Sequence, residues 1–378
     1  MRFVTLALAA ALASTSSAAA EDLPKDNNVL FWTQAQRDAA FRVMEKLTPT
    51  NEIVAGGKPH RLVQGKPLAI KTDMAAYMAE QRNAGLIIVH RGKIRFEEYG
   101  LGLSGKDRWT SFSVAKSITS TLVGAAIRDG YVKSLDDKVT KYIPDLRGSA
   151  YDDVSVRQLL TMTSGVKWSE NYFDPKSDVA LFTAHKAEPG VDVTVSYMRK
   201  LPRAAPAGSQ WVYKTGETNL IGVLVSSATG KTLSAYLSEK IWKPYGMEAP
   251  AVWMLGSAGH EVSGCCFSAV LRDFARFGQF ILDGGKGVLP RDWLARATRK
   301  QVETGSPGSG YGYQWWTKDD ASFSARGIFG QAIFIDPKRQ LVIASNGNWP
   351  LAVDSRGVGA KRDQFHKVVQ AAIDSEGR

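Results

Sequence analysis

Ser113 and Lys116 are the residues whose types and spacing most directly suggest chemistry. They lie three positions apart in the stretch TSFSVAKSI, at the start of a run that is apolar enough to form a buried helix. Residues i and i+3 are neighbours on one face of a helix, so the Lys116 amine can reach the Ser113 hydroxyl. Because serine is a weak nucleophile without an adjacent base, we interpret Lys116 as that base.

A lysine acts as a base only if its pKa falls from about 10.4 toward neutrality. Burial among apolar neighbours lowers the pKa, and a position in the first turn of a helix adds a field that opposes positive charge. A Ser-x-x-Lys spacing also arises on solvated helix faces, where it carries no chemistry. The remaining elements of the chain therefore decide between catalysis and a chance match.

The residues around Lys116 predict a core helix that runs through Ile127 and ends at Gly130, because the segment is apolar on most faces. Upstream, residues 33–46 show the pattern of an amphipathic helix. Residues 85–100 alternate around a short Arg-Gly-Lys turn, which is typical of a β-hairpin.

Further along, residues 135–247 carry the signals of helices and loops. Short apolar and aromatic runs typical of strands begin at Tyr311, and a last helix is expected at about 361–374. Strands at both ends of the chain around a helical middle predict an α+β fold, with one sheet assembled from the two ends and covered by helices.

Seven segments in order resemble the serine hydrolases of the class C beta-lactamase and penicillin-binding protein type. They are SFSVAKSITSTLVGAAIRDG, SLDDKVTKYIPDL, SVRQLLTMTSGVKW, PAGSQWVYKTGETNLIGVL, KIWKPYGM, RDFARFGQFILDGG and GIFGQAIFIDP. Two more, WSENYFDP and GYGYQWW, look most like the 6-aminohexanoate-dimer hydrolases. The resemblance runs from about Pro67 to the C-terminus. It implies a beta-lactamase/transpeptidase-like antiparallel sheet flanked by helices, with a helical insertion.

The implied organisation is an N-terminal helix and approach segment at 21–66, followed by a catalytic domain at 67–378. Within that domain the sheet is expected from about 67–130 and 290–378, and a mainly helical subdomain from about 131–289.

The resemblance also implies a second catalytic element, a Tyr-x-Asn motif, which VYKTGETN matches at Tyr213. A phenol in that place can pass protons between the nucleophile, the lysine and the leaving group. Thr215 stands where many relatives carry asparagine, and we expect it to contact substrate. Losing the amide disfavours recognition of a beta-lactam side chain. Taken alone, Tyr213 could equally be an aromatic packed under a loop.

The third element in such enzymes is Lys-Thr-Gly or His-x-Gly on an edge strand, and SARGIFGQ matches it at Gly327. This match implies that the backbone N–H groups of Ser113 and Ile328 form the oxyanion hole. Ala325 replaces the expected lysine or histidine. The neighbouring Arg326 is open to two interpretations, a contact with a substrate carboxylate or a solvated charge on an edge strand.

Two aromatic positions are further candidates. Tyr172 matches a tyrosine that similar amide hydrolases use to contact the scissile amide, although a structural aromatic is a close alternative. Trp315 and Trp316 are expected to fill the core behind the sheet, with one ring available to line the cleft.

Histidine chemistry is not expected, because the chain has no Gly-x-Ser-x-Gly nucleophile elbow. Met162 replaces a histidine that is frequent in the group, and His366 has the pattern of a surface or packing residue in the last helix. The five histidines show no ligand-like spacing, so neither a metal nor another cofactor is predicted.

Cys265 and Cys266 are the two cysteines of the chain, and they are adjacent. Because disulfide Cα atoms prefer a separation of about 5.5 Å, two small buried hydrophobic residues are expected rather than a disulfide.

The first twenty residues, with Arg2, an apolar run and Ala18-Ala19-Ala20, have the pattern of a secretory signal peptide. We therefore expect a mature chain that begins near Glu21, is periplasmic or secreted, and has no transmembrane segment. The net charge is +11, but Lys and Arg are scattered, so nucleic-acid binding is not expected. The sequence leaves the oligomeric state open.

The predicted function is an exported serine hydrolase that forms an acyl-enzyme and cleaves small amides or short-chain esters. Beta-lactamase or D-alanyl-D-alanine carboxypeptidase activity fits less well, given Thr215 and Ala325. A protein that keeps the fold but only binds cell-wall peptide is the alternative from another class, and the intact Ser113, Lys116 and Tyr213 argue against it.

Overall fold

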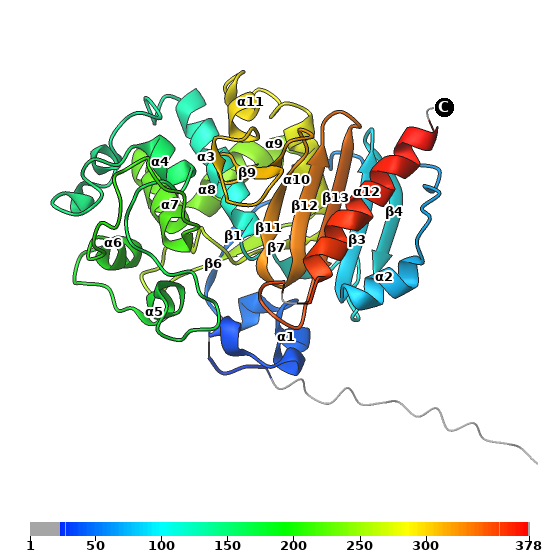
Figure 1. The fold of residues 1–378 in the computed structure, drawn as a ribbon, viewed down its shortest axis with the longest axis horizontal. Coiled ribbons are helices and arrows are strands. Elements are labelled where there is room, and N and C mark those ends of the chain that lie inside the picture. Colours follow the sequence, from blue (N-terminus) through cyan, green and yellow to red (C-terminus); the bar gives the residue numbers. More distant parts are fainter. Residues whose placement is uncertain (1–22, 27, 355, 377–378) are drawn as a thin grey trace, which may run out of the picture.

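The structure is a computed structural model and describes residues 23–26, 28–354 and 356–376. The predicted signal peptide lies outside the described residues. A nine-stranded sheet forms the centre of the molecule, in the order β2-β4-β3-β13-β12-β11-β10-β9-β8 (Figure 1). Its strands are β2 (Val63–Gln64), β3 (Asn83–His90), β4 (Lys93–Tyr99), β8 (Val302–Glu303), β9 (Ser309–Tyr311), β10 (Trp316–Lys318), β11 (Phe323–Gly327), β12 (Gln331–Asp336) and β13 (Leu341–Gly347).

The sheet joins the two ends of the chain, as the sequence predicted, because β3 pairs with β13. Every pairing in it is antiparallel except that of β2 with β4. The expected hairpin is formed by β3 and β4. Arg91 and Gly92 between them both have a positive φ, which suits the twist of a two-residue hairpin turn.

A second sheet of four short strands was not predicted. Its order is β1-β6-β7-β5, and its strands are β1 (Thr50–Ile53), β5 (Arg108–Thr110), β6 (Ala251–Met254) and β7 (Phe267–Val270). β6 and β7 lie inside the part expected to be mainly helical, where each is only four residues long. This sheet matters for function because β5 leads directly to Ser113, and the Ser111 N–H donates to the Phe267 carbonyl at 2.7 Å.

Twelve α-helices are described, and they cover both faces of the large sheet and build the helical region (Figure 1). They are α1 (Gln34–Ala40), α2 (Met74–Glu80), α3 (Val114–Arg128), α4 (Val156–Leu160), α5 (Asp178–Ala184), α6 (Val193–Met198), α7 (Thr215–Thr229), α8 (Leu233–Leu237), α9 (Lys243–Tyr245), α10 (Leu271–Leu282), α11 (Trp293–Ala297) and α12 (Val358–Glu376). A π-helical turn, Ser238–Trp242, joins α8 to α9.

The expected helix at 33–46 is shorter than predicted. A capping box between Thr33 and Gln36 starts α1, but the helix ends after Ala40, and a separate 3₁₀ turn follows at Met44–Lys46. The break lets the Phe41 carbonyl accept the Thr110 N–H of β5 at 3.1 Å. The last helix, α12, starts three residues earlier than expected.

Alternation along the strands divides the core between the two faces of the sheet. Leu86 and Ile88 of β3 pack with α12, whereas Ile87 and Val89 face the larger core that contains α3 and α10. Helix α3, which follows Ser113, therefore lies on the face opposite α12, with thirteen of its fifteen residues buried.

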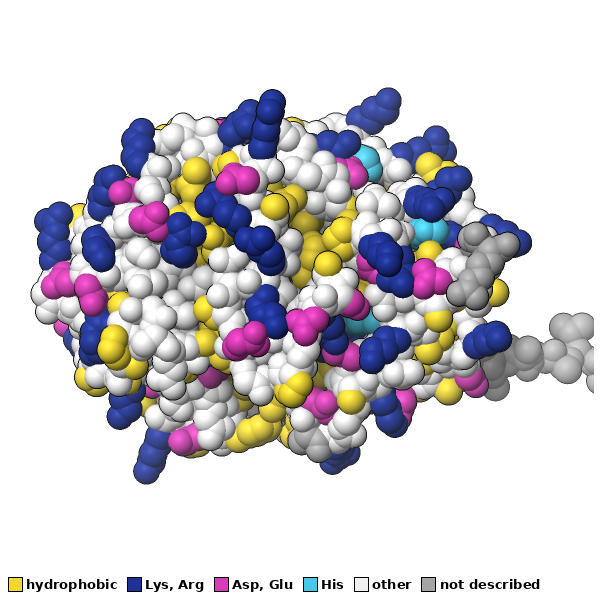
Figure 2. All heavy atoms as spheres, turned by 45° about the horizontal axis from the view of Figure 1, so that its top comes forward, with side chains coloured by type: hydrophobic (Ala, Val, Ile, Leu, Met, Phe, Trp, Pro, Cys, Tyr) yellow, Lys and Arg dark blue, Asp and Glu magenta, His cyan; other side chains and the backbone are white. Residues whose placement is uncertain are grey.

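Lys and Arg are spread over the face of the molecule shown in Figure 2, with Asp and Glu among them, so the net charge of +11 does not form one basic patch there. Within the described residues, no single helix is long and apolar enough to cross a membrane. The bent pair Thr215–Thr229 and Leu233–Tyr245 has the necessary length and composition, but its two parts meet at 74°.

Candidate active site

Ser113 occupies the N-cap of α3, at the end of a turn with unusual backbone geometry. The residue before it, Phe112, has a φ of +42°, a conformation that is unfavourable for a side chain with a Cβ. The Phe112 ring is held by Phe41 and Phe329, with ring centroids 5.0 and 5.2 Å away. This aromatic cluster fixes the turn, and Ser113 lines a cavity while remaining only 8% exposed.

Lys116 is one turn further along α3 and is 1% exposed. Its Nζ donates to the Gly264 carbonyl at 2.7 Å and to Thr215 Oγ1 at 3.0 Å. Burial lowers the pKa of Lys116 to about 8, although the negative charge of Glu170 acts in the opposite direction. The buried amine predicted from sequence is therefore present, and its two acceptors are uncharged groups.

Glu170 is the site residue that sequence reasoning missed. Its carboxylate accepts the Tyr172 hydroxyl at 2.8 Å, the Thr215 backbone N–H at 2.9 Å, the Thr215 hydroxyl and the Trp168 indole N–H. The signal was its place two residues before Tyr172 in WSENYFDP, which the resemblance had already singled out. The carboxylate also lies at the first residue of α7, where a helix favours negative charge.

These hydrogen bonds fix the direction of each proton around Lys116. The single proton of the Thr215 hydroxyl is given to Glu170, so Thr215 Oγ1 must accept from Lys116. A neutral Lys116 amine has two protons, which the Thr215 oxygen and the Gly264 carbonyl receive. Its lone pair is left free to take a proton from a third group.

Tyr213 lies beside this pair. Burial raises the pKa of Tyr213, the charge of Glu170 raises it further, and a hydrogen bond with the Ser113 side chain opposes both. The Lys116 Nζ is 5.3 Å from the centroid of the Tyr213 ring, and Trp316 stacks on that ring at 5.6 Å. Tyr213 is therefore a neutral phenol next to the Ser113 side chain, and Trp316 is the tryptophan that stacks on it, whereas Trp315 is in the core.

Gly327 and Ile328 lie where the third element was predicted, at the end of β11. A Cβ on Gly327 would be 2.6 Å from the Ser111 carbonyl oxygen and 3.1 Å from the Phe112 side chain, so only glycine lets the two segments approach so closely. Ile328 and Ser113 line the same cavity. β11 pairs with β10 only through Phe323 and Ser324, which leaves Ala325–Gly327 without a strand on that side.

Arg326 does not join the site, which corrects its proposed contact with substrate. Along β11, Phe323 and Ala325 face the core that contains α3, so the alternate residues face α12. Arg326 accordingly donates from Nε to Ser324 at 2.8 Å and pairs with Asp363 of α12 at 3.2 Å. The side chain points away from Ser113 and contributes to packing between the sheet and the last helix.

The cavity in front of Ser113 has a volume of about 710 Å³. Tyr172 and Thr215, two of the residues predicted to contact substrate, line it, and so does Ile328, the predicted second donor of the oxyanion hole. Gly327 is not among the residues that line it. The face of α7 adds Asn219, Ser226 and Ser227. The Tyr172 phenol points to Glu170, and burial together with that carboxylate raises the pKa of Tyr172 well above its ordinary value.

Cys265 and Cys266 form a disulfide, which corrects the prediction that they are two separate buried thiols. Their Cα atoms are 3.7 Å apart, the ordinary spacing of sequence neighbours, and Cys266 has a φ of +68°. The usual Cα separation had argued against a disulfide between sequence neighbours. In the structure this disulfide occurs together with a left-handed backbone at Cys266. Both cysteines line the cavity, directly after Gly264.

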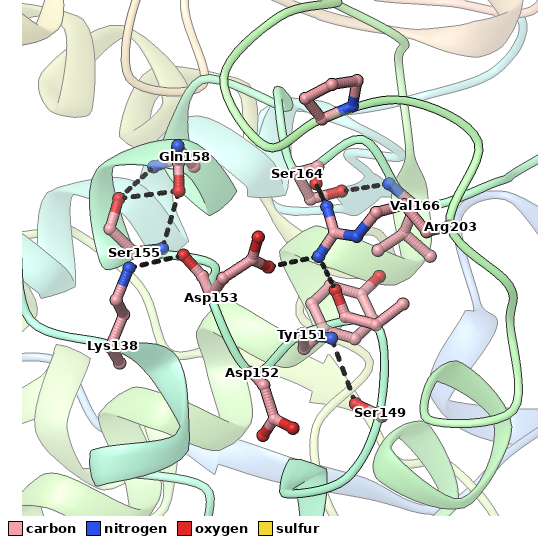
Figure 3. A network of polar contacts seen from close by, with 12 residues as sticks. Lys138, Ser149, Tyr151, Asp152, Asp153, Ser155, Gln158, Ser164, Val166 and Arg203 are labelled. Atoms are coloured by element: carbon pink, nitrogen blue, oxygen red, sulfur yellow. Dashed lines mark hydrogen bonds and ion pairs between the residues drawn. The ribbon is translucent and has the colours of Figure 1, made fainter.

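A buried polar network around Lys214 and Glu217 holds the segment that contains Tyr213. Lys214 and Glu217 are both completely buried, with Nζ and Oε1 3.8 Å apart. Glu217 also accepts from Ser164 and from Tyr151 at 3.4 Å. In Figure 3, Ser164 lies beside Arg203, which donates to the Ser164 carbonyl at 3.0 Å and pairs with Asp153. The loop after α4 is thereby tied to the start of α7.

Met162 and His366 both belong to the packed interior. The Met162 sulfur accepts the Lys214 backbone N–H at 3.3 Å. The position where related enzymes often carry a histidine is therefore part of the core in this protein. His366 is buried and stacks on Phe334 at 4.3 Å, which makes it a packing residue.

Comparisons with known proteins agree with this geometry. A family model described as Beta-lactamase matches residues 70–363. The chain is 28% identical over 300 residues to the 6-aminohexanoate-dimer hydrolase of Paenarthrobacter ureafaciens, which covers 74% of this chain and 76% of the relative. Among solved structures, a Bacillus anthracis protein assigned as a 6-aminohexanoate-dimer hydrolase matches with a TM-score of 0.79 at 22% identity, covering 94% of this chain and 99% of that one.

A family VIII carboxylesterase has the same fold, with a TM-score of 0.62 at 16% identity over 82% of this chain and 99% of that one. The fold is therefore the beta-lactamase/transpeptidase-like arrangement of an antiparallel sheet flanked by helices, as predicted. Since the family model spans most of the sequence, the chain belongs to the beta-lactamase family and is a serine hydrolase.

Proposed function

We propose that the protein cleaves small linear amides or esters through an acyl-enzyme on Ser113, with Lys116 as the general base. The observation that carries this proposal is the Lys116 amine, which is 1% exposed and, among the described residues, donates hydrogen bonds to two uncharged groups, the Gly264 carbonyl and the Thr215 hydroxyl. With a pKa of about 8, about a tenth of this amine is neutral at pH 7 and about half at pH 8.

In the proposed reaction, Lys116 takes the Ser113 proton while the serine oxygen attacks the substrate carbonyl carbon. The N–H groups of Ser113 and Ile328 stabilise the negative oxygen that forms. Tyr213 gives its phenol proton to the departing nitrogen or oxygen and regains a proton from Lys116. Water then cleaves the acyl-enzyme by the reverse sequence of proton transfers, which releases the acid and restores Ser113.

The substrate class follows from the cavity and from the relative in Paenarthrobacter. A volume of about 710 Å³ suits a small molecule rather than a folded protein. Its polar lining from α7 is uncharged, and Glu261, His185 and His260 line other parts of it. The size of the cavity and the 28% identity to a 6-aminohexanoate-dimer hydrolase support short oligoamides of that type, with short-chain esters as the other candidates.

The decisive experiment is active-site labelling with a fluorophosphonate, compared between the wild type and Ser113→Ala. The wild type should label once per chain, and the folded variant should not label. Turnover should then be measured on 6-aminohexanoate dimer, p-nitrophenyl acetate, nitrocefin and a D-alanyl-D-alanine peptide. Faster cleavage of nitrocefin or of the peptide would replace the proposed substrate class. Binding without labelling or turnover would favour a non-catalytic binding protein.

We also propose that the protein is exported to the periplasm or beyond the cell. The support is the sequence of the first twenty residues, with its basic start, apolar run and small residues before Glu21. Mass spectrometry of the expressed protein tests this. A mature N-terminus near Glu21 is expected, and an intact Met1 in the cytoplasmic fraction would contradict export.

A further inference from the structure

The Cys265–Cys266 disulfide lies in the wall of the cavity, one residue from a group that holds the catalytic lysine. Cys265 and Cys266 line the cavity together with Ser113 and Thr215. The preceding residue, Gly264, supplies the carbonyl that accepts from Lys116 Nζ at 2.7 Å. No step of the proposed reaction uses the two sulfur atoms, so their place beside Lys116 calls for another role.

The segment before the disulfide is fitted tightly against α3 and α7. The Gly264 N–H donates to Asn219 of α7 at 2.7 Å, and Thr119 of α3 donates to the Ser263 carbonyl at 2.9 Å. A Cβ on Gly264 would be 2.9 Å from the Thr215 methyl group. Gly264 therefore has little free space around it, and the carbonyl that Lys116 uses belongs to the peptide bond that joins Gly264 to Cys265.

Cys266 supplies the link between the disulfide and this backbone. Its φ of +68° lies in the left-handed region, which residues with a Cβ disfavour. While the two sulfur atoms are bonded, the eight-membered ring that they close holds this conformation. After reduction the ring no longer holds this conformation, which a residue with a Cβ disfavours, while the Met254 N–H still donates to the Cys266 carbonyl and the Trp253 indole N–H to the Cys265 carbonyl, both at 3.0 Å.

We propose that the Cys265–Cys266 disulfide is a reduction-sensitive site in the active-site wall, and that its cleavage by a small dithiol lowers turnover by displacing the Gly264 carbonyl from Lys116. This inference rests on the proposed roles of Ser113 and Lys116. It assigns the site a class of reactant, the dithiols, and it gives the protein a response to redox conditions.

The exchange reaction begins at Cys265, which is partly exposed, whereas Cys266 is 4% exposed. A thiolate of the dithiol attacks the Cys265 sulfur, the bond between the cysteines breaks, and Cys266 leaves as a thiolate that takes up a proton. The second thiol of the reductant then attacks the mixed disulfide and releases Cys265. Two cysteine thiols and a cyclic oxidised reductant are formed, so the protein gains two electrons and two protons.

The test compares the folded wild type before and after treatment with dithiothreitol, with p-nitrophenyl acetate as substrate and fluorophosphonate as active-site label. Intact mass after alkylation counts the thiols. We expect two thiols per chain after treatment, since the sequence has two cysteines. A fall in kcat of about tenfold to a hundredfold should accompany them, with KM little changed and recovery on reoxidation, because a small displacement of a catalytic group is costly.

Two variants separate the backbone effect from other consequences of reduction. Cys265→Ala/Cys266→Ala removes the bond and should be slow from the outset and insensitive to dithiothreitol. Cys265→Ala/Cys266→Gly also removes the bond, but glycine tolerates positive φ, so this variant should keep most of the wild-type kcat.

Unchanged kcat with both thiols present, or a disulfide that resists dithiothreitol in the folded protein, would overturn the inference. So would equal activity of the two double variants. Failure of the proposed function gives a different result, because the oxidised wild type would then neither label nor turn over.

Discussion

Two lysines are completely buried near the start of α7, and their surroundings differ in one respect. Lys116 binds two uncharged oxygens, the Gly264 carbonyl and the Thr215 hydroxyl. Lys214 lies 3.8 Å from the Glu217 carboxylate, and both of these side chains are fully buried. The Lys116 amine is placed to give up its proton. The Lys214 amine is half of an ion pair that ties the loop after α4 to the start of α7.

The comparison teaches that burial alone does not make an amine a base. Burial lowers the pKa of Lys116 to about 8, and the charge of Glu170, whose carboxylate binds the Thr215 hydroxyl rather than the amine, opposes this only in part. At Lys214, the neighbouring group is itself a carboxylate, that of Glu217. Burial raises the pKa of Glu217, and the charge of Lys214 opposes that rise, so the pair is stabilised as a unit.

The largest expected effect comes from Lys116→Arg. A guanidinium remains charged, so it cannot take the Ser113 proton, and kcat should fall about 10²–10⁴-fold. Fluorophosphonate labelling and ester turnover measure this, and circular dichroism checks that the variant is folded. The matched control is Lys214→Arg, which keeps a positive charge beside Glu217 and should lose far less activity per folded molecule. Equal losses in the two variants would remove the distinction between the lysines.

The second prediction concerns stability at the other lysine. Lys214→Met leaves Glu217 buried without its partner and should lower the free energy of unfolding by about 3–5 kcal/mol. Chemical denaturation measures the loss. Replacing both members, as in Lys214→Met/Glu217→Leu, should recover most of it, because no unpaired charge remains. If the double variant is as unstable as the single one, packing at Lys214 rather than the ion pair explains the effect.

How much of this was visible in the sequence differs between the two lysines. Lys116 could be predicted because its chemistry is local: a serine one helical turn away, apolar neighbours, and a run of motifs in order. Lys214 and Glu217 are also close in sequence, but their burial depends on Ser164 and Tyr151, which are brought to them only by the fold.

Contacts that only the fold brings together also explain why the sequence did not predict the roles of Glu170, the disulfide and Arg326. Glu170 reaches Lys116 through Thr215, which is 45 residues away along the chain, so no local pattern reports the contact. The disulfide was not expected because disulfide Cα atoms usually lie farther apart, yet Cys265 and Cys266 are linked with their Cα atoms 3.7 Å apart and a left-handed backbone at Cys266. Arg326 was placed correctly on its strand, but the face it occupies depends on register, and the pairing partner Asp363 comes from α12.

The third prediction tests the charge next to Lys116. Because the Glu170 charge raises the pKa of Lys116, Glu170→Gln should lower that pKa. In the wild type, kcat/KM should rise with pH through an apparent pKa near 8, as the ammonium loses its proton. In the variant, this rise should occur at lower pH, with a maximum reduced about tenfold because Thr215 loses its charged acceptor.

Two substitutions at Thr215 serve as controls for that experiment. Thr215→Ser keeps the hydroxyl and should resemble the wild type. Thr215→Val removes the hydroxyl but leaves the Glu170 charge, so its rate should fall without the downward shift of the pH profile. A profile that does not move in Glu170→Gln would show that this carboxylate does not influence the base.

The smallest effect is expected at Arg326, which the sequence left open as a substrate contact. Its side chain is 25% exposed and pairs with Asp363 rather than facing the cavity, so it resembles Lys214 more than Lys116 in being tied to a carboxylate. Arg326→Ala should therefore leave KM and kcat within about twofold of the wild type and cost about 0.2–1 kcal/mol of stability. A large rise in KM for a substrate that carries a carboxylate, but not for p-nitrophenyl acetate, would return Arg326 to the binding site. It would also mean that the pair with Asp363 opens when substrate binds.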